Sequence, residues 1–360
     1  IEKFEEVSEN LKNQSESAFK NSVLNMPAMQ LVMYSTILGI LLLGGHLVKA
    51  GELGIGQLTS FLSYVLLILN SLMMMSNVFM MMTRSLVSGA RIMEVLDEKI
   101  DITDELARDI SVEHGEIEFD HVWFKYKEEA EEYVLSDISF HIKPGQTVGI
   151  IGQTGSAKTT LVQLIPRLYD VSRGVVKVDG VDVKEYPMRH LRDAIAMVLQ
   201  KNTLFSGSLL SNLKWGNEDA TMEEIEEACH IACVDEFIDR LSDGYDTEMG
   251  QGGVNVSGGQ KQRICIARAI LKKPKVLILD DSTSAVDTAT EAKIREGLAR
   301  KLPNMTKIVI AQRISSVRHA DRIIILDKGK VDGIGTHESL LASNKIYQEI
   351  YESQKEGADL

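Results

Sequence analysis

The segment Gly152 to Thr160 carries the clearest chemical signal in the chain, because its residue types and spacing suit the binding of phosphate. It follows an apolar run at 147–151 and precedes a helical pattern at 161–165. A strand, a glycine-rich turn and a helix in this order direct backbone N–H groups at an anion, and the helix N-terminus adds partial positive charge. The nine residues are Gly152, Gln153, Thr154, Gly155, Ser156, Ala157, Lys158, Thr159 and Thr160.

Within this loop, Lys158 and Thr159 are the residues that we expect to contact nucleotide and metal. The Lys158 ammonium would reach the β- and γ-phosphates of a nucleoside triphosphate, and the Thr159 hydroxyl would bind Mg²⁺. Ala157 stands where the pattern G-x-x-x-x-G-K-[ST] requires glycine. Its Cβ adds bulk at a position where glycine gives conformational freedom and close approach.

Two downstream segments add a second anion site and a pair of carboxylates. Ser257, Gly258, Gly259 and Gln260 form a turn that opens a helical pattern, so they predict a second helix N-terminus suited to an anion. The apolar run 276–279 indicates a buried strand, and it is followed by two acids, Asp280 and Asp281. Carboxylates at the end of a strand suit the binding of Mg²⁺ through water and the orientation of a nucleophile.

Two long apolar stretches precede these motifs. They lie at about 27–48 and 57–82, contain no Asp, Glu, Lys or Arg, and are joined by a short polar loop. Each is long enough to cross the ~30 Å of hydrocarbon in a bilayer, so the sequence predicts a membrane hairpin. Arg84 and Arg91 follow the second stretch, as positive-inside residues do. Without a charged residue in either span, these helices offer no relay for protons or ions.

The remaining sequence predicts one soluble domain. Residues 98–113 are polar and acidic and indicate a linker, and strand and helix patterns alternate across 114–360. We expect an α/β fold with a mostly parallel core sheet and an antiparallel β part at its start. The predicted strands lie at 117–119, 122–124, 138–142, 147–151, 276–279 and 307–311.

The overall composition argues against nucleic acid as a partner. The 360 residues include 39 Lys and Arg against 52 Asp and Glu, a formal net charge of −13. Recognition of a phosphate backbone usually needs a basic face instead.

The first residues already have the pattern of a helix interior, so we expect residues 1–97 to be the C-terminal part of a larger transmembrane domain.

The order of a phosphate loop, a Ser-Gly-Gly-Gln turn and an apolar strand with its acid resembles the ATP-binding cassette (ABC) family. The fused membrane segment resembles an ABC exporter half-transporter, which consists of membrane helices followed by a P-loop NTPase domain of ABC type. The resemblance implies ATP and Mg²⁺ as cofactors and a multi-pass location in the cell membrane, with the cassette in the cytoplasm. It also implies a second half-transporter subunit, contact with the lipid bilayer and an amphipathic substrate, for which the uncharged, Met-rich second span is suited.

The same resemblance assigns roles to individual residues. Tyr126 is placed to stack on adenine, and Gln200 is placed to ligate Mg²⁺ and to sense the membrane helices. Asp280 is the Mg²⁺-associated carboxylate, alongside Thr159 as a metal ligand. Ser257 to Gln260 match the signature, which binds the γ-phosphate held by the opposite subunit. Residues 284–287 match a loop that crosses the dimer interface.

Three residues depart from the family pattern in one functional unit. Asp281 replaces the glutamate that polarises the attacking water. Its side chain is shorter by one methylene, which withdraws the carboxylate by roughly 1.5 Å, and a misplacement of ~1 Å can lower the rate on the order of 10²-fold. Gln312 replaces the switch histidine, and its amide hydrogen-bonds phosphate but carries no charge. Ala157 is the third departure.

These departures predict weakened hydrolysis with retained ATP binding, and the signature is unchanged. That asymmetry resembles one subunit of a heterodimeric exporter, which binds ATP at an impaired site of its own and completes the catalytic site of its partner. The catalytic candidates are Asp281, Gln312, Lys158, Ser257, Gly258, Gly259 and Gln260. Two alternatives stay open: a homodimeric exporter that hydrolyses ATP slowly at both sites, and a non-transporting ATP-gated membrane regulator.

Overall fold

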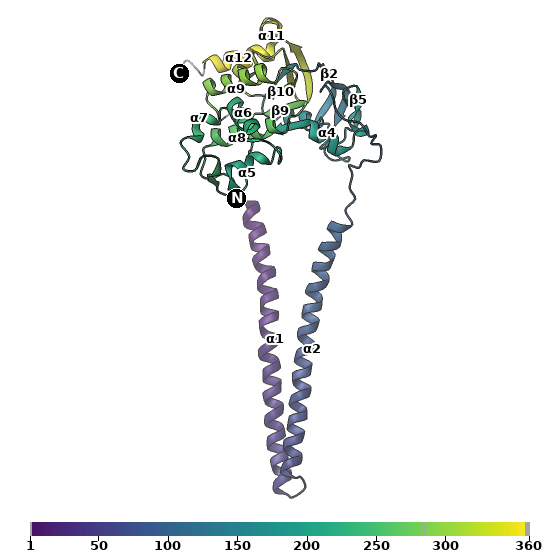
Figure 1. Cartoon of the computed structure of the whole chain (residues 1–360). Helices are drawn as coiled ribbons and strands as arrows, with labels where there is room; N and C mark the ends of the chain where they lie inside the picture. Colours follow the sequence, from purple (N-terminus) through teal and green to yellow (C-terminus); the bar gives the residue numbers. More distant parts are fainter. Residues whose placement is uncertain (1, 284, 357–360) are drawn as a thin grey trace. The chain divides into compact units, whose positions relative to one another are not determined.

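The computed structural model describes residues 2–283 and 285–356 of the chain. The polypeptide forms two compact units, and the division between them falls between Ile100 and Asp101. The first unit contains two long helices, and the second contains every strand of the described residues (Figure 1). The P-loop and signature segments both lie in the second unit.

The first unit is an antiparallel pair of helices, α1 (Glu2–Lys49) and α2 (Ile55–Leu96). Both contain stretches that are long and apolar enough to cross a membrane. The helices pack together beside the loop that joins them, where a Cβ on Gly44 would lie only 2.2 Å from Cδ1 of Leu58. Glycine at this position therefore permits the close approach of the two helices.

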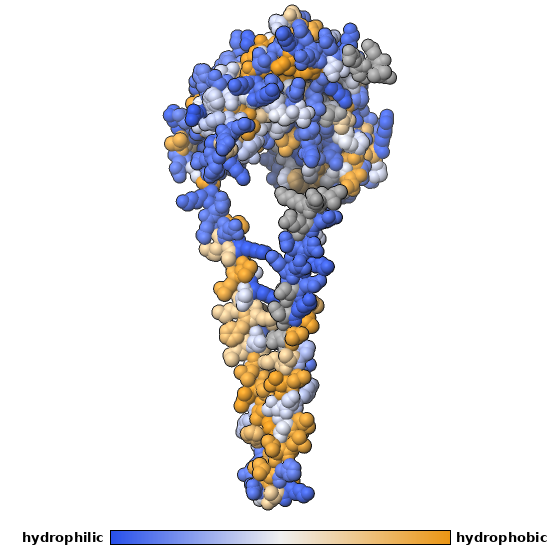
Figure 2. Space-filling view, turned by 180° about the vertical axis from the view of Figure 1, so that it is seen from behind, coloured by the Kyte–Doolittle hydropathy of each residue, from blue (hydrophilic) through white to orange (hydrophobic). Residues whose placement is uncertain are grey.

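Most apolar side chains of the helix pair are exposed in this chain. None of the residues in α2 is buried, and Figure 2 shows apolar side chains gathered on the stretch of the pair nearest the loop. An apolar surface of this extent requires lipid or further helices to cover it. The surface is therefore consistent with a membrane segment that makes contacts beyond these two helices.

The second unit is built on a six-stranded sheet in the order β12-β11-β3-β10-β9-β6. The five strands from β11 to β6 are parallel, and β12 is antiparallel to β11. The strands are β3 (Thr147–Ile151), β6 (Ile195–Val198), β9 (Val276–Asp280), β10 (Thr306–Ile310), β11 (Arg322–Asp327) and β12 (Lys330–Gly335). All five residues of β9 are buried, as expected of a strand covered on both faces.

A second sheet is antiparallel and has the order β2-β1-β4-β5. Its strands are β1 (Ile117–Phe124), β2 (Leu135–Ile142), β4 (Arg173–Val178) and β5 (Val181–Asp182). The sequence predicted separate strands at 117–119 and 122–124, but these form the single strand β1. The register with β2 shifts between Phe119 and Val122, and His121 has a φ of 49°, so a bulge explains the interrupted apolar pattern.

Helices cover the six-stranded sheet (Figure 1), and two short strands, β7 (Gly207–Ser208) and β8 (Glu248–Met249), form a separate antiparallel pair. The strand β9 alternates between two core clusters: Leu277 and Leu279 pack with one, Val276 and Ile278 with the other. The helices are α3 (Lys158–Gln163), α4 (Met188–Ala194), α5 (Leu209–Lys214), α6 (Met222–Ile231), α7 (Asp235–Ile238), α8 (Gly258–Leu271), α9 (Thr288–Lys301), α10 (Ile314–Val317), α11 (His337–Ser343) and α12 (Lys345–Glu356), with 3₁₀ turns at Val183–Glu185 and Gly244–Asp246.

Residues 101–113, within the segment expected to be a linker, have no helix or strand but belong to the second unit and pack against the rest of it. The Asp104 carboxylate accepts a hydrogen bond from the backbone N–H of Met188 at 2.9 Å. The backbone N–H of Arg108 donates to the carbonyl of Glu185 at 2.7 Å, and Val112 is buried in the core. These contacts hold the start of the second unit in place before β1 begins.

Candidate nucleotide-binding site

The predicted phosphate loop lies between β3 and α3, at the carboxyl end of a central parallel strand. A Cβ on Gly152 would lie 2.1 Å from the carbonyl oxygen of Leu326, so only glycine fits where the chain leaves β3. Gly155 has a φ of 83°, which is a conformation that glycine adopts at no steric cost. Gln153 and Thr154 are exposed, whereas Ser156 and Thr160 are buried.

Ala157 adopts the conformation for which the pattern provides glycine. It is the N-cap residue of α3, with φ 71° and ψ 26° in the left-handed region. This conformation is destabilising by roughly 1–2 kcal/mol for a residue with a Cβ. Ala157 therefore adopts a left-handed conformation that alanine itself disfavours.

The Lys158 ammonium folds back over the loop. Its Nζ donates to the carbonyl oxygens of Gly152 at 2.8 Å and Gln153 at 2.9 Å. Burial lowers the pKa of Lys158, and the charges of Asp281 and Asp280 partly oppose that shift. The ammonium is thus a half-buried cation at the mouth of the loop, where a phosphate would supply the opposite charge.

Asp280 and Thr159 lie together beside the loop. Asp280 is the last residue of β9 and is almost fully buried. Burial raises the pKa of Asp280, and a hydrogen bond with the Thr159 side chain acts in the opposite direction. The Thr159 hydroxyl, the Asp280 carboxylate and the side-chain oxygen of Gln200 are hard oxygen donors, which fit Mg²⁺.

A metal at this site would need more than protein ligands. Among the described residues, no group of three or more His, Cys, Asp and Glu side chains is arranged to hold a metal ion. Mg²⁺ is commonly held by one or two protein side chains together with phosphate oxygens and water. The residues present therefore fit a metal that arrives with a nucleotide. When bound, it would neutralise phosphate charge.

Asp281 joins the ends of three strands through one oxygen atom. Its Oδ2 accepts hydrogen bonds from Nε2 of Gln200 at 3.0 Å and from Nε2 of Gln312 at 2.7 Å. Gln200 follows β6, Asp281 follows β9 and Gln312 follows β10. Burial raises the pKa of Asp281, whereas the hydrogen bond from Gln312, the charge of Lys158 and the hydrogen bond from Gln200 lower it.

Tyr126 lies at the other side of the phosphate loop. Its hydroxyl is 2.9 Å from the hydroxyl of Thr160, the last residue of the loop. The ring makes edge contacts with Phe124 and Tyr169, at centroid distances of 4.9 and 5.1 Å, and half of the residue is exposed. Tyr126 therefore presents a fixed, accessible aromatic surface next to the loop.

The signature residues form the start of α8. Oγ of Ser257 accepts from the backbone N–H of Gln260 at 3.2 Å, and Oε1 of Gln260 accepts from the backbone N–H of Ser257 at 2.8 Å. This reciprocal capping box fixes the first turn of the helix. Ser257 and Gly258 are exposed, so the helix N-terminus is open to solvent. No hydrogen bond in the part of the chain that the structure describes joins these four residues to the phosphate loop.

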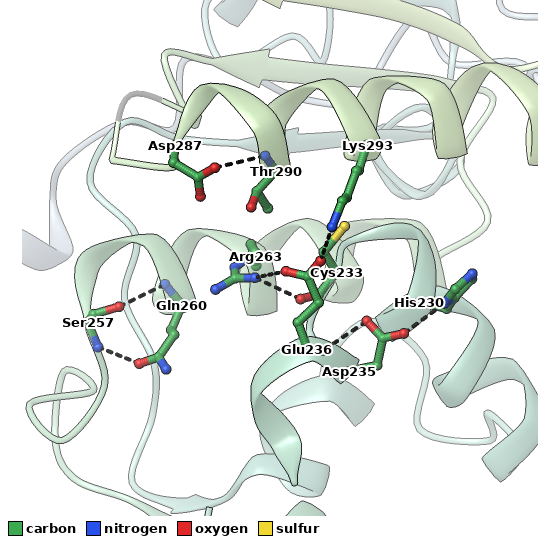
Figure 3. A network of polar contacts seen from close by, with 10 residues as sticks. All are labelled: His230, Cys233, Asp235, Glu236, Ser257, Gln260, Arg263, Asp287, Thr290 and Lys293. Carbon is green, nitrogen blue, oxygen red and sulfur yellow. Dashed lines mark hydrogen bonds and ion pairs between the residues drawn. The ribbon is translucent and has the colours of Figure 1, made fainter. Parts of the chain in front are cut away.

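A polar network holds α8 against its neighbouring helices (Figure 3). Arg263 of α8 donates to the carbonyl of Cys233 at 2.9 Å and pairs with Glu236 of α7 at 3.1 Å. The other oxygen of Glu236 pairs with Lys293 of α9 at 2.7 Å. Glu236 therefore links α8 to α9 through two ion pairs.

The loop at 284–287 lies against the signature helix where it is described; Ser284 is outside the described residues. A Cβ on Gly259 would lie 2.7 Å from the carbonyl oxygen of Ala285, so glycine permits the contact. The backbone N–H of Ala285 donates to Oε1 of Gln262 at 3.1 Å. Asp287 caps α9 by accepting from the backbone N–H of Thr290 at 3.0 Å.

The structure thus places the predicted site residues in two groups. Lys158, Thr159, Asp280, Asp281, Gln200 and Gln312 meet at one edge of the sheet with Tyr126 nearby, and the signature residues lie apart at the start of α8. The sequence analysis missed Gln354 of α12, whose side chain contacts the backbone of Gln312 at 2.7 Å. No pattern indicated that contact, because the residues are 42 positions apart.

Two family models match this sequence: "ABC transporter" over residues 135–284 and "ABC transporter transmembrane region" over residues 1–72. The chain belongs to the ABC transporter family. The predicted fold class is therefore confirmed, with a helical membrane region followed by an ABC ATPase domain. The predicted location in a membrane, with the ATP-binding domain on the cytoplasmic side, is likewise confirmed.

Several characterised and uncharacterised ABC proteins are similar to this chain. YfiB of Bacillus subtilis, an uncharacterized ABC transporter ATP-binding protein, is 41% identical over 367 residues, covering 100% of this chain and 62% of YfiB. An ATP-dependent lipid A-core flippase of Alkalilimnicola ehrlichii is 41% identical over 303 residues, covering 84% of this chain and 51% of the flippase. A bacterial Atm1-family ABC exporter with ATP bound matches with a TM-score of 0.76 and 31% identity, over 91% of this chain and 57% of that one. The chain thus spans between half and two thirds of the length of these relatives.

The position of Lys158 predicts that Lys158→Ala strongly weakens ATP binding at this chain's own site. The variant removes the only charged side chain of residues 152–160, and hydrogen bonds to charged groups contribute about 1.5–3 kcal/mol each, so affinity should fall about 100-fold. Equilibrium binding of a fluorescent ATP analogue measures this. Lys143→Ala, an exposed lysine of the same unit, is the matched control. Equal affinity in the two variants would contradict the loop assignment.

Proposed function

We propose that this chain is one subunit of an ATP-driven ABC exporter with two unequal ATP sites. It binds ATP and Mg²⁺ at its own degenerate site, and it supplies an unaltered signature to the hydrolytic site of a different partner subunit. The observation that carries this proposal is the contrast between the two groups of site residues. The residues proposed to hold nucleotide lie together at one edge of the sheet. Two of them, Asp281 and Gln312, differ from the family pattern, whereas the signature residues at the start of α8 match it.

The assembled residues support ATP binding. Lys158 provides a partly buried cation at the loop, and Thr159 and Asp280 provide oxygen ligands for Mg²⁺. Tyr126 offers a ring beside Thr160 on which adenine stacks. Ala157 keeps the left-handed conformation that the loop needs. None of these features requires that the bound ATP be hydrolysed.

The hydrogen bonds of Asp281 support weak hydrolysis at the same site. A general base must reach the water whose proton it accepts, and the aspartate carboxylate is one methylene shorter than glutamate. Both side-chain amides, from Gln200 and Gln312, already donate to its Oδ2. A neutral glutamine at 312 also removes the charge that a histidine could bring to the γ-phosphate.

The start of α8 supports a role in a partner's site. Its capping box leaves the N-terminus exposed, and ion pairs through Glu236 link the helix to α9. An ordered, solvent-facing helix N-terminus is ready to receive a phosphate held by another chain. The phosphate loop of this chain makes no hydrogen bond with the start of α8 among the described residues, so we propose that the phosphate comes from another chain.

The helix pair supports transport of an amphipathic substrate. Its apolar surface is uncharged and contains a run of flexible methionines, Met73 to Met75 and Met80 to Met82. Methionine side chains repack around apolar ligands of differing shape. One similar protein is a lipid A-core flippase, a name that refers to an amphipathic lipid. Two helices alone enclose no pathway, so other membrane helices and the partner subunit complete it.

The shared-site arrangement predicts that Gly258→Asp suppresses ATP turnover in the complex with the partner. A Cβ at Gly258 would meet Ala285 at an ordinary contact distance of 3.5 Å, so the fold accommodates the change. Aspartate also suits a helix N-terminus, but its charge would repel the partner's γ-phosphate. Steady-state hydrolysis should fall by about 100-fold or more, as expected from losing a stabilising site worth about 3 kcal/mol.

Gly258→Ala is the matched control, because it adds the same Cβ without charge and should retain most activity. Full turnover with Gly258→Asp would show that this signature completes no catalytic site.

The defect at Asp281 predicts that Asp281→Glu raises hydrolysis at this chain's own site only modestly. The longer carboxylate restores reach, but Gln312 persists, so we expect less than about a 10-fold gain out of the 10²-fold that such a misplacement costs. Asp281→Glu combined with Gln312→His should exceed the product of the single effects, because the two side chains are in contact.

Single-turnover hydrolysis measures this gain in the Gly258→Asp background. In that background, hydrolysis at the partner's site is suppressed, and the residues of this chain's own site are unchanged. Asp281→Asn, which removes the carboxylate charge, is the control. A large gain from Asp281→Glu alone would contradict the coupled defect.

A further inference from the structure

The side chain of Gln354 binds the backbone on both sides of Arg313, directly after Gln312. Its Nε2 donates to the carbonyl oxygen of Gln312 at 2.7 Å, and its Oε1 accepts from the backbone N–H of Ile314 at 2.9 Å. One amide therefore uses a donor and an acceptor on peptide groups two residues apart. This arrangement fixes the backbone from which the Gln312 side chain projects.

The helix α12 that carries Gln354 is anchored to the second unit. Tyr347 is fully buried, and its hydroxyl lies 2.8 Å from Nδ1 of His337 in α11. Ile350 and Tyr351 pack against the cluster that includes Ile314. Gln354 lies one turn beyond these residues, so an anchored helix carries it to the backbone at residues 312–314.

The segment that Gln354 contacts has no side-chain cap of its own. Gln312 and Arg313 are exposed. The helix α10 begins at Ile314, and its N-cap residue Arg313 makes no side-chain cap hydrogen bond. The first N–H groups of a helix need partners from outside it. Oε1 of Gln354 accepts from the N–H of Ile314, the first residue of α10. Gln354 therefore acts as an N-cap side chain that comes from a distant helix.

We infer that Gln354 is a positioning residue for Gln312, through which α12 controls the γ-phosphate side of this ATP site. A continuous series of hydrogen bonds runs from Gln354 to Gln312, from Gln312 to Asp281, and from Asp281 to Gln200. The C-terminal helix is thereby coupled to the residue that follows β6. This inference rests on the proposed role of Gln312 at the γ-phosphate.

The test compares affinities for ATP and ADP in the full-length protein with Mg²⁺, using equilibrium competition against a fluorescent nucleotide. ADP lacks the γ-phosphate, so a residue that acts through Gln312 affects ATP only. We expect Gln354→Ala to weaken ATP about 5-fold, the loss of roughly one hydrogen bond, with ADP unchanged. Gln312→Ala should weaken ATP at least as much, and the double variant no further, because the two residues act in series.

The chain offers a matched control in Gln348→Ala. Gln348 is a half-buried glutamine of the same helix, and its Nε2 donates to the carbonyl of Leu341 at 2.7 Å instead of to residues 312–314. Its removal should leave the ratio of ATP to ADP affinity unchanged. Gln354→Glu keeps an acceptor for the N–H of Ile314 but turns a carboxylate oxygen toward the carbonyl oxygen of Gln312, so it should weaken ATP at least as much as Gln354→Ala.

Three outcomes would overturn the inference. If Gln312→Ala weakens ATP selectively and Gln354→Ala does not, the positioning role is wrong while the proposed function stands. If Gln348→Ala has the same effect as Gln354→Ala, the effect belongs to the helix as a whole. If Gln312→Ala leaves the ratio unchanged, the γ-phosphate role of Gln312 fails, and the inference fails with it.

Discussion

Oδ2 of Asp281 is the atom on which the arrangement of the nucleotide site depends. It accepts hydrogen bonds from Gln200 and Gln312, so it ties together the segments that follow β6, β9 and β10. Those segments can meet because parallel strands deliver their carboxyl ends to one edge of a sheet. The phosphate loop leaves β3 at the same edge, which places Lys158 near the carboxylates that oppose the burial shift of its pKa.

Local signals in the sequence indicated β3, β10 and β9, three adjacent strands of the parallel sheet, but not β6, β11 or β12. Buried parallel strands appear as continuous apolar runs, and the predicted strand at 147–151 coincides with β3. Local signals failed where the geometry is not periodic. The bulge at His121 divided β1 into two predicted strands, and the contact of Gln354 with Gln312 joins helices and loops far apart in the sequence. The left-handed conformation of Ala157 likewise follows from the loop as a whole, since alanine itself disfavours it.

The proposed difference between the two ATP sites rests on the substitutions and on the hydrogen bonds of Asp281. Asp281 is short, and both neighbouring amides already donate to it. At the start of α8, by contrast, the cap and the Glu236 network leave an ordered and exposed helix N-terminus. In the proposed exporter, a pair of unequal sites would separate two tasks. One ATP would keep the cassettes in contact, and hydrolysis of the other would reset the membrane helices.

The most direct test of this account is steady-state ATP hydrolysis by the full-length protein, purified alone and then together with its co-purifying partner. The account predicts near-zero turnover by the protein alone and substantial turnover by the complex, because only the partner's site combines a competent base with the signature at Ser257 to Gln260. Vigorous hydrolysis by the protein alone would contradict it, and would show that Asp281 and Gln312 suffice for catalysis in a homodimeric pump.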